Sequence, residues 1–369
     1  MINKKIVHLT SVHLRYDIRI FQKECISLSK AGFDVTLIVA DGKGNEIIND
    51  IKIIDVVSSL ASSRIVRILK FPRLVHVAAL KLEADVYHFH DPELIPVGLK
   101  LMKAGKKVIY DIHEDLPRQT LSKDYIPKLF RVPLSAILEY YENKSIKQFE
   151  AVITATPFIN NRVLQLHEKS VNINNFPITS ELVLAKELEK KENAVCFVGA
   201  ISRLRGVKEL VEAVFLANVK LYLAGKFTES DFEQEVKQLP GWKNVVEYGH
   251  LDRKQVANLM ANCIGGVVTF LPAPNHCNAQ PNKMFEYMSA GLPVICSDFP
   301  LWREIIEANE CGICVNPSDP EAIAKGIKKI AFSSKAGAKF GKNGKLAIKE
   351  KYNWEAESKK LIDLYNNVI

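Results

Sequence analysis

The segment from Asn278 to Asp298 combines features that suit a polar, anionic ligand. Its Gln-Pro-Asn sequence predicts a loop that enters a helix near Asn282, and the N–H groups of a first helical turn attract negative charge. Glu286 lies about one turn into that helix, where its carboxylate can accept hydrogen bonds from two hydroxyl groups. We therefore expect an anion or a polar sugar in front of this helix.

A second segment, Gly199-Ala-Ile-Ser-Arg-Leu-Arg-Gly206, follows a predicted strand and precedes a predicted helix. It brings the guanidinium groups of Arg203 and Arg205 beside exposed backbone amides, a combination that suits a diphosphate. A solvated basic turn is the alternative that the residues leave open.

Histidines follow two predicted strands of the first half. His88 and His90 end one strand, and His113 ends the next, where it would face a cleft. Histidines at neighbouring strand ends could resemble a metal-binding cluster without binding a metal. However, the sequence contains no Asp-x-Asp motif for a nucleotide-bound metal, and Arg205 already supplies positive charge, so we expect chemistry without a metal ion.

The elements that must position these residues alternate between short apolar strands and stretches of helical length. The pattern predicts a parallel sheet covered on both faces. The strands expected in the first half lie at residues 5–9, 35–40, 86–89, 107–112 and 151–155, with a helix at 18–30. The strands expected in the second half lie at 194–199, 220–224, 245–248, 265–270, 293–296 and 313–315.

The two series are separated by a polar, irregular stretch at residues 172–193, which we interpret as the interdomain linker. The fold class is therefore α/β, with two doubly wound domains at residues 1–175 and 194–350. Ligands of such sheets bind beyond the carboxyl ends of the strands. We expect the site between the two domains.

The residues around Glu286 carry a resemblance to a known family. Glu286 followed by Tyr-Met-Ser-Ala-Gly-Leu-Pro-Val-Ile resembles the hallmark of the retaining nucleotide-sugar glycosyltransferases of family 4, which have the two-Rossmann fold called GT-B. The resemblance covers essentially the whole chain. It implies that residues 351–369 form a helix that crosses back onto the first domain, that the first domain holds the acceptor, and that the second binds the nucleotide sugar.

The resemblance also implies roles for individual residues. Glu286 would bind the nucleotide ribose, Arg205 the pyrophosphate with Arg203 as a second cation, and His113 would approach the transferred sugar. The remaining residues implied for the donor are Gly225, at a strand end, the segment Tyr248, Gly249, His250 and Leu251, which reads the base, and Ala279, Asn282 and Lys283 at the helix start.

The chain departs from the family pattern in two places. Asn278 stands where the family has a first glutamate facing the donor sugar, so an amide replaces a carboxylate there. An amide is not a practical nucleophile. We therefore expect retention by same-face attack, with Asn278, His113 and Arg205 as the catalytic residues. The loop from Thr10 to Arg19 lacks the family's glycines and resembles a subgroup associated with bacterial surface polysaccharides such as O-antigen, capsule or lipopolysaccharide.

The distribution of charge bears on the acceptor. Residues 1–180 carry 25 Lys and Arg against 19 Asp and Glu, which is +6 of the total net charge of +8. The run from Arg64 to His76 spaces four cations among apolar residues and predicts an amphipathic helix at a membrane interface. The apolar and basic residues 126–134 add to this surface. A core-facing helix with an ordinary basic outer face is the alternative.

Composition excludes several classes of protein. Apolar residues at 47% and charged residues at 25% are typical of soluble globular domains. No run of apolar residues is long enough to span a bilayer, and the first residues lack a signal peptide, so we expect a cytoplasmic protein, peripheral at the inner face of a membrane. Seven scattered cysteines indicate reduced core residues and no disulfide framework.

The expected function is transfer of a hexosyl or N-acetylhexosaminyl group from a UDP-sugar to a glycan or lipid-linked acceptor, with no cofactor. A sugar-nucleotide epimerase or hydrolase of the same fold, and a non-catalytic sugar-nucleotide-binding protein, remain as alternatives. Nucleic acid ranks last among partners because the basic segment has few interleaved aromatic residues.

Overall fold

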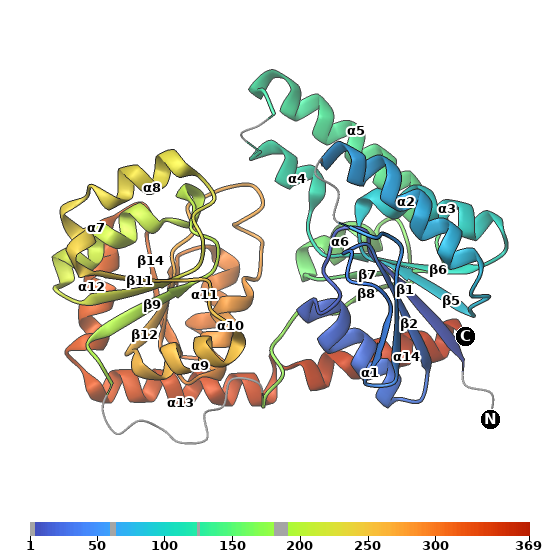
Figure 1. Cartoon of the computed structure of the whole chain (residues 1–369). Coiled ribbons are helices and arrows are strands. Elements are labelled where there is room, and N and C mark those ends of the chain that lie inside the picture. Colours follow the sequence, from blue (N-terminus) through green and yellow to red (C-terminus); the bar gives the residue numbers. More distant parts are fainter. Residues whose placement is uncertain (1–3, 60–63, 124–125, 181–190) are drawn as a thin grey trace. The chain divides into compact units, whose positions relative to one another are not determined.

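The computed structural model describes residues 4–59, 64–123, 126–180 and 191–369, which divide into two compact units (Figure 1). The first unit contains residues 1–175 and 354–369, and the second contains residues 176–353. Each unit is built around one sheet, and each is described here by itself.

The first unit has an eight-stranded sheet in the order β3-β4-β2-β1-β5-β6-β7-β8. All of its strand pairs are parallel except β3 with β4. Its strands are β1 (Lys5–Leu9), β2 (Asp34–Val39), β3 (Glu46–Ile48), β4 (Ile51–Asp55), β5 (Val86–Phe89), β6 (Lys107–Ile112), β7 (Ala151–Thr154) and β8 (Ser170–Asn172). Its helices are the π-helix η1 (Ile18–Cys25), α1 (Ile26–Lys30), α2 (Arg64–Leu80), the 3-10 turn η2 (Pro92–Leu94), α3 (Ile95–Lys103), α4 (Leu116–Leu121), α5 (Lys128–Ile146), α6 (Pro157–Leu164) and α14 (Trp354–Val368).

Alternation along the central strands of this sheet separates two kinds of side chain. Val7 and Leu9 of β1 and Tyr87 and Phe89 of β5 pack into the apolar core with α2 and α3. The intervening histidines point to the opposite face, which η1 and α14 cover. This face therefore contains a buried polar layer.

The last helix belongs to the first unit. Nε1 of Trp354 donates a 2.9 Å hydrogen bond to Ser27 of α1, and Nζ of Lys107 donates a 2.7 Å bond to the carbonyl oxygen of Val368. The backbone N–H of Asn174 donates to the Glu357 carboxylate at 2.8 Å. These contacts join residues more than 150 positions apart in the sequence.

The second unit has a six-stranded parallel sheet in the order β11-β10-β9-β12-β13-β14. Its strands are β9 (Ala194–Val198), β10 (Lys220–Ala224), β11 (Val245–Gly249), β12 (Gly265–Val268), β13 (Val294–Ser297) and β14 (Gly312–Val315). Its helices are η3 (Arg203–Arg205), α7 (Val207–Ala217), α8 (Ser230–Lys237), η4 (Pro240–Asn244), α9 (Arg253–Asn262), α10 (Asn282–Ser289), α11 (Pro300–Ile306), α12 (Pro320–Ala331) and α13 (Ser334–Glu350).

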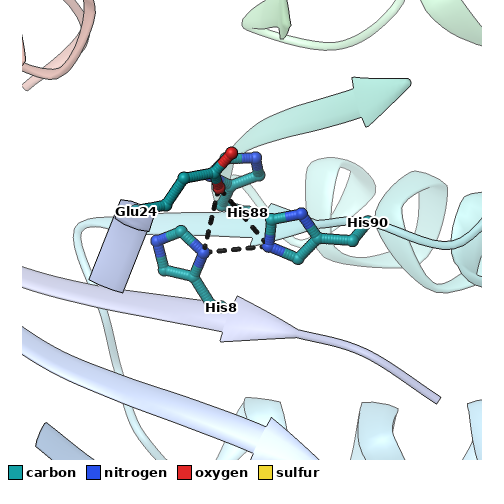
Figure 2. A group of neighbouring side chains, drawn as sticks. All are labelled: His8, Glu24, His88 and His90. Carbon is teal, nitrogen blue, oxygen red and sulfur yellow. Dashed lines mark hydrogen bonds and ion pairs between the residues drawn. The ribbon is translucent and has the colours of Figure 1, made fainter. Parts of the chain in front are cut away.

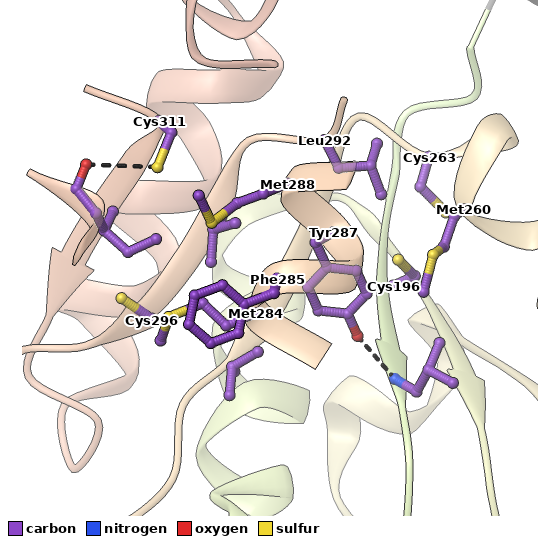
Figure 3. Close-up of a cluster of buried hydrophobic side chains, with 14 of the residues drawn as sticks. Cys196, Met260, Cys263, Met284, Phe285, Tyr287, Met288, Leu292, Cys296 and Cys311 are labelled. Carbon is purple, nitrogen blue, oxygen red and sulfur yellow. Dashed lines mark hydrogen bonds between the residues drawn. The ribbon is translucent and has the colours of Figure 1, made fainter. Parts of the chain in front are cut away.

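Sulfur-containing side chains are prominent in the core of this unit (Figure 3). Met284 and Met288 of α10 lie in one cluster with Cys196, Cys263 and Cys296. All seven cysteines of the chain are free, and five are buried. The prediction that most cysteines are unpaired core residues is confirmed.

The two α/β sheets, parallel except for the pair β3–β4, and the terminal helix confirm the predicted fold class. The predicted linker is wrong at its first residues, because Asn172 ends β8 and Asn174 is hydrogen-bonded to α14. The helix expected at 18–30 is a π-helix followed by α1, and the short strands β3, β4 and β8 were not predicted. Residues 181–190 of the expected linker lie outside the described residues.

Candidate active site

The helix α10 presents Glu286 from a tightly packed position in the second unit. Its neighbours in sequence, Phe285 and Tyr287, are fully buried, and the backbone N–H of Val198 donates a 2.9 Å hydrogen bond to the Tyr287 hydroxyl (Figure 3). Gly266 of β12 leaves room for the Tyr287 ring, which an added Cβ would overlap. The packing of Phe285 and Tyr287 therefore holds α10, and with it Glu286, in place against the sheet.

Two cations hold the Glu286 carboxylate. Oε1 lies 3.0 Å from Nη1 of Arg253, and Oε2 is paired with Nζ of Lys283. Burial raises the pKa of Glu286, but the charges of Lys283 and then Arg253 outweigh it, so the pKa is lowered. The carboxylate is ionised at neutral pH and keeps lone pairs to accept hydroxyl groups.

Arg205 lies where the strand β9 ends. A Cβ built on Gly199 would lie 2.8 Å from Nη1 of Arg205, so glycine leaves space for the guanidinium. The guanidinium carbon lies 5.2 Å from the centre of the Phe270 ring, within cation–π range. Gly225, at the end of β10, has a φ of +151° and lies so close to Gly199 that an added Cβ would overlap its carbonyl oxygen.

The aromatic residues around Arg205 connect it to the loop before α10. The Phe270 ring lies 5.7 Å from that of Trp302, whose Nε1 donates a 2.7 Å hydrogen bond to the carbonyl oxygen of Ala279. Asn278 is the half-buried residue before Ala279. Among the described residues, no side chain caps the start of α10, so the predicted anion-binding amides near Asn282 are not occupied by a capping side chain.

Arg203 is directed elsewhere than Arg205. Its Nη1 lies 2.6 Å from Oε2 of Glu235, and its guanidinium carbon lies 4.8 Å from the centre of the Phe232 ring, both on α8. Arg203 therefore has an ion-pair partner on α8, and Arg205 is the better candidate for the diphosphate.

The segment predicted to read the base, residues 248–251, begins in the last two residues of β11 and continues into the loop after it. The backbone N–H of Gly225 donates a 2.7 Å hydrogen bond to the carbonyl oxygen of Gly249, which places this segment beside the end of β10. Tyr248 and His250 are exposed on either side of Gly249, and Leu251 is half-buried. These four residues lie at the same edge of the sheet as Arg205, because all strand pairs here are parallel.

His113 belongs to the first unit and follows β6. Its Nε2 lies 2.9 Å from Oδ2 of Asp111 and 3.1 Å from Nδ1 of His90. A carboxylate only accepts hydrogen bonds, so Nε2 of His113 carries the hydrogen and Nδ1 is left as an acceptor. The half-buried His113 can therefore accept a hydrogen bond from a hydroxyl group.

Asp111 is held by a buried arginine. Nε and Nη2 of Arg19 donate hydrogen bonds of 2.9 and 2.8 Å to its two carboxylate oxygens. Burial raises the pKa of Asp111, but the charge of Arg19 outweighs it and the pKa lies well below its usual range. Asp111 is therefore an ionised anchor for His113.

Sequence reasoning missed two functional candidates. His13, in the loop after β1, lies 2.8 Å from Asp91 through its Nδ1, and its ring centre lies 5.3 Å from that of His113. Arg253 pairs with Glu286 from α9. Neither residue carried a signal in the sequence that distinguished it from a surface residue. His13 stands between two apolar residues, and Arg253 follows an N-cap aspartate.

The candidate residues thus form two groups. Glu286, Arg205 and Ala279 share one edge of the second sheet, whereas His113 belongs to the first unit. Within the described residues, no helix is both long and apolar enough to cross a membrane.

Comparison with known proteins matches both units. Residues 24–175 match the model of Glycosyltransferase Family 4, and residues 181–347 match that of Glycosyl transferases group 1. An uncharacterized glycosyltransferase of Methanocaldococcus jannaschii is 26% identical over 183 residues, 48% of this chain and 46% of that protein. A human alpha-1,3/1,6-mannosyltransferase is 25% identical over 302 residues, 72% of this chain and 69% of that protein. A second archaeal relative is matched over 57% of its length, so the chain spans about half of these archaeal proteins.

Solved structures share the fold. Sucrose-phosphate synthase from Thermosynechococcus elongatus superposes with a TM-score of 0.79 at 18% identity, covering 99% of both chains. Anabaena HepE in complex with UDP and glucose superposes with a TM-score of 0.73 at 16% identity, covering 99% of this chain and 100% of that one.

Proposed function

We propose a reaction for this chain on the premise that it belongs to the GT-B glycosyltransferase superfamily: transfer of a sugar from a nucleotide diphosphate to an acceptor hydroxyl. The observation that carries the proposal is that Arg205 and Glu286 both follow the carboxyl ends of parallel strands of the second sheet, Arg205 beside Gly199 after β9 and Glu286 on α10 after β12. A cation and an ionised carboxylate there match the diphosphate and the ribose of a nucleotide sugar.

Arg205 stabilises the leaving group in this proposal. Negative charge builds on the diphosphate as the sugar departs and becomes oxocarbenium-like, so a fixed cation stabilises the transition state more than the bound substrate. The N–H groups at the start of α10 add to this effect. This fixed charge allows the donor diphosphate to react without a metal ion.

Glu286 holds the donor by its ribose. The two cations beside it keep it ionised, and it accepts hydrogen bonds from the two ribose hydroxyls. Exposed Tyr248 lies near the base-reading backbone of Gly249 and His250. We propose UDP as the nucleotide.

Asn278 and His113 act on the transferred sugar. Asn278 orients a hydroxyl or acetamido group by hydrogen bonding and supplies no charge. Nδ1 of His113 accepts a hydrogen bond from a sugar hydroxyl, since its Nε2 hydrogen is donated to Asp111. The departing phosphate takes the proton of the attacking acceptor on the same face, so the configuration is retained.

The acceptor is a glycan or a lipid-linked glycan of a bacterial surface polysaccharide, and the surface of two helices supports a lipid carrier. On α5, Leu129 is 82% exposed, and Phe130, Val132 and Ile137 are also exposed. On α2, Leu69 is exposed beside the exposed cations Lys70 and Arg73. Both helices contact α3. The side chain of Arg64 lies outside the described residues.

Such a surface suits peripheral binding to an anionic membrane. Apolar side chains enter the interface and cations meet the lipid headgroups, at about 1 kcal/mol for each Lys or Arg near the surface. In this proposal, the enzyme works in the cytoplasm at the inner face of the membrane.

Two experiments test the reaction. A thermal-shift panel of nucleotide diphosphates identifies the base, because a ligand at 100 times its Kd adds about 2.7 kcal/mol of stability. NMR of products with and without acceptor then distinguishes the activities. Transfer gives a retained glycoside only when acceptor is present. An isomerised or hydrolysed nucleotide sugar without acceptor would instead indicate an epimerase or hydrolase, and binding without turnover would indicate a non-catalytic protein.

A further inference from the structure

Three histidines of the buried polar layer lie on one face of the first sheet. His8 of β1 is directly opposite His88 of β5 in the parallel register, and His90 lies two residues further on the same side. Their side chains are 0 to 1% exposed. The apolar residues between them face the other way, so the three imidazoles gather at one place.

Glu24 completes the group from the helix η1, as Figure 2 shows. Its Oε2 lies 3.9 Å from Nδ1 of His8 and 3.9 Å from Nε2 of His90, and these two nitrogens are 2.9 Å apart. One ligand atom from each of the four residues lies within 4.8 Å of all the others. Glu24 is fully buried. The π-helical form of η1 is frequent at functional sites.

Several polar atoms in this group have no hydrogen-bond partner among the residues that the structure describes. Nε2 of His88 and both carboxylate oxygens of Glu24 are buried without one. Oε1 of Glu24 lies 3.1 Å from Nε of Arg19, but that N–H is donated to Asp111. Leaving such groups unsatisfied is costly, more so for a charged one. The unpartnered atoms indicate a missing positive ligand.

The outer nitrogens of the same rings have partners suited to N–H donors. Nδ1 of His88 and Nε2 of His8 lie 2.8 and 3.3 Å from the hydroxyl oxygen of Tyr365. Nδ1 of His90 lies 3.3 Å from Oδ2 of Asp111. When these three nitrogens carry hydrogens, the other nitrogen of each ring has a free lone pair. These are Nδ1 of His8, Nε2 of His88 and Nε2 of His90, and they face one another and Glu24. Histidines that bind metals are typically oriented in this way by a second hydrogen bond.

The charge balance agrees with the geometry. Neutral imidazole is the form of histidine that binds a metal. Arg19 forms ion pairs with both Glu24 and Asp111, so these two buried carboxylates share one arginine.

We propose that His8, His88, His90 and Glu24 bind one divalent transition-metal ion, with zinc as the best fit. Three imidazole nitrogens and one carboxylate oxygen are ligands that zinc prefers, and its sites are mostly tetrahedral. Tetrahedral zinc–nitrogen bonds of about 2.0 Å put ligand atoms about 3.3 Å apart. The separations of 2.9 to 4.8 Å reach that geometry by small shifts.

The site is structural. Four protein ligands leave no open position, and the group is buried, so substrate does not reach the ion. The ion would join β1, β5 and η1, and through Tyr365 also α14. Asp111 contacts both His90 and His113. By fixing the His90 ring, the metal would therefore also help to hold Asp111, which anchors the candidate sugar-binding residue His113. This site is separate from the donor diphosphate, which belongs to the second unit.

The direct test is the metal content of the full chain, purified without a polyhistidine tag. We expect about one zinc per chain by inductively coupled plasma mass spectrometry. Stripping the metal should lower the melting temperature, and zinc should restore it. Cobalt(II) in place of zinc should give the strong visible absorption of a tetrahedral site, and X-ray absorption should show only nitrogen and oxygen ligands.

Variants localise the ion. Glu24→Gln keeps the size of the side chain but is a poorer ligand, and His88→Gln removes one imidazole. Each should weaken zinc binding by at least about tenfold. His167→Gln is the matched control, because His167 lies in the same unit and bonds to the carbonyl oxygen of Phe149. It should bind zinc like the wild type.

Two results would overturn the proposal. One is a folded wild-type protein that contains no transition metal and shows neither a melting shift with zinc nor a cobalt spectrum. The other is zinc that stays at the wild-type level in both Glu24→Gln and His88→Gln, which would place the ion elsewhere. If both variants fail to fold, the cobalt spectrum and X-ray absorption of the wild type still decide the question.

Discussion

Nδ1 of His13 lies 2.8 Å from Oδ1 of Asp91, which ties the loop after β1 to the end of β5. The other Asp91 oxygen accepts hydrogen bonds from the backbone N–H groups of Ser11 and Val12. Burial raises the pKa of Asp91, but the hydrogen bond from His13 and those from the loop lower it to about 2. Burial lowers the pKa of His13, and the Asp91 partner raises it above 6.5 overall.

The His13–Asp91 pair predicts a pH-dependent stability. Because the pKa of His13 is raised in the folded state, its ionisation stabilises the fold. This contribution to the free energy of unfolding is complete below about pH 6.5 and is lost as the pH rises through the folded-state pKa. The lowered pKa of Asp91 means that its contribution is lost only toward pH 2. The unfolding free energy of His13→Gln should therefore fall furthest below that of the wild type near about pH 5 and less near about pH 8. Urea titrations measure it, and a difference that is constant with pH would mean that His13 does not become charged.

Glu286→Ala should reduce turnover about 100-fold or more, which is about 2.7 kcal/mol, because the donor ribose loses its acceptor. Donor binding should weaken as well, measured by calorimetry. Glu304→Ala, which changes an exposed glutamate on α11, is the control and should behave like the wild type. Near-normal activity in a folded Glu286→Ala protein would remove the proposed role.

Arg205→Ala should lose about 2 to 4 kcal/mol of transition-state stabilisation, read from kcat/KM. Arg205→Lys should keep part of it, since a charge remains without the planar fork. Arg203→Ala should have a smaller effect than Arg205→Ala, because Glu235 holds the Arg203 guanidinium. The opposite order would show that Arg203 is the diphosphate ligand.

Asn278→Ala should reduce sugar transfer more than it reduces affinity for the bare nucleotide diphosphate, whose contacts lie at Arg205 and Glu286. Asn278→Asp is the companion variant, because it places a carboxylate at this position without changing the size of the side chain. Transfer rates and calorimetric Kd values give the comparison. Equal losses for both ligands would contradict a role at the sugar.

The membrane proposal predicts salt-sensitive binding to phosphatidylglycerol vesicles. Arg67→Glu with Lys70→Glu should release the protein and lower activity on a lipid-linked acceptor, while donor binding survives. Phe130→Ser should weaken binding with little dependence on salt, because it removes apolar contact. Lys325→Glu with Lys328→Glu, on the exposed face of α12 in the second unit, is the charge-matched control. Wild-type protein that stays in the supernatant at low salt would point to a soluble acceptor.

Sequence patterns predicted the central strands because continuous apolar runs such as that of β9 are buried on both faces of a parallel sheet. These patterns missed β3 and β4 at the edge of the first sheet. Their residues alternate and include charged ones, because one side of this edge is exposed to solvent. Glu286 was found because its helix has a recognisable sequence.

The sequence showed only half of the proposed metal site. His88 lies in β5 and His90 follows two residues later on the same side, which is a local pattern. Glu24 and Tyr365, however, come from distant helices, and their approach depends on how η1 and α14 pack on the sheet. Local sequence carries no record of such long-range packing.

The contacts of α14 have a consequence for the order of synthesis. A ribosome produces β1 early and residues 354–369 only after the whole second unit, yet Tyr365 contacts both His8 and His88. The nascent first unit therefore waits, with the part of this face beside His8 and His88 not yet covered by α14, while the second unit emerges. A chain that stopped before Trp354 would lack that cover, so residues 354–369 complete the packing of a layer that begins at β1.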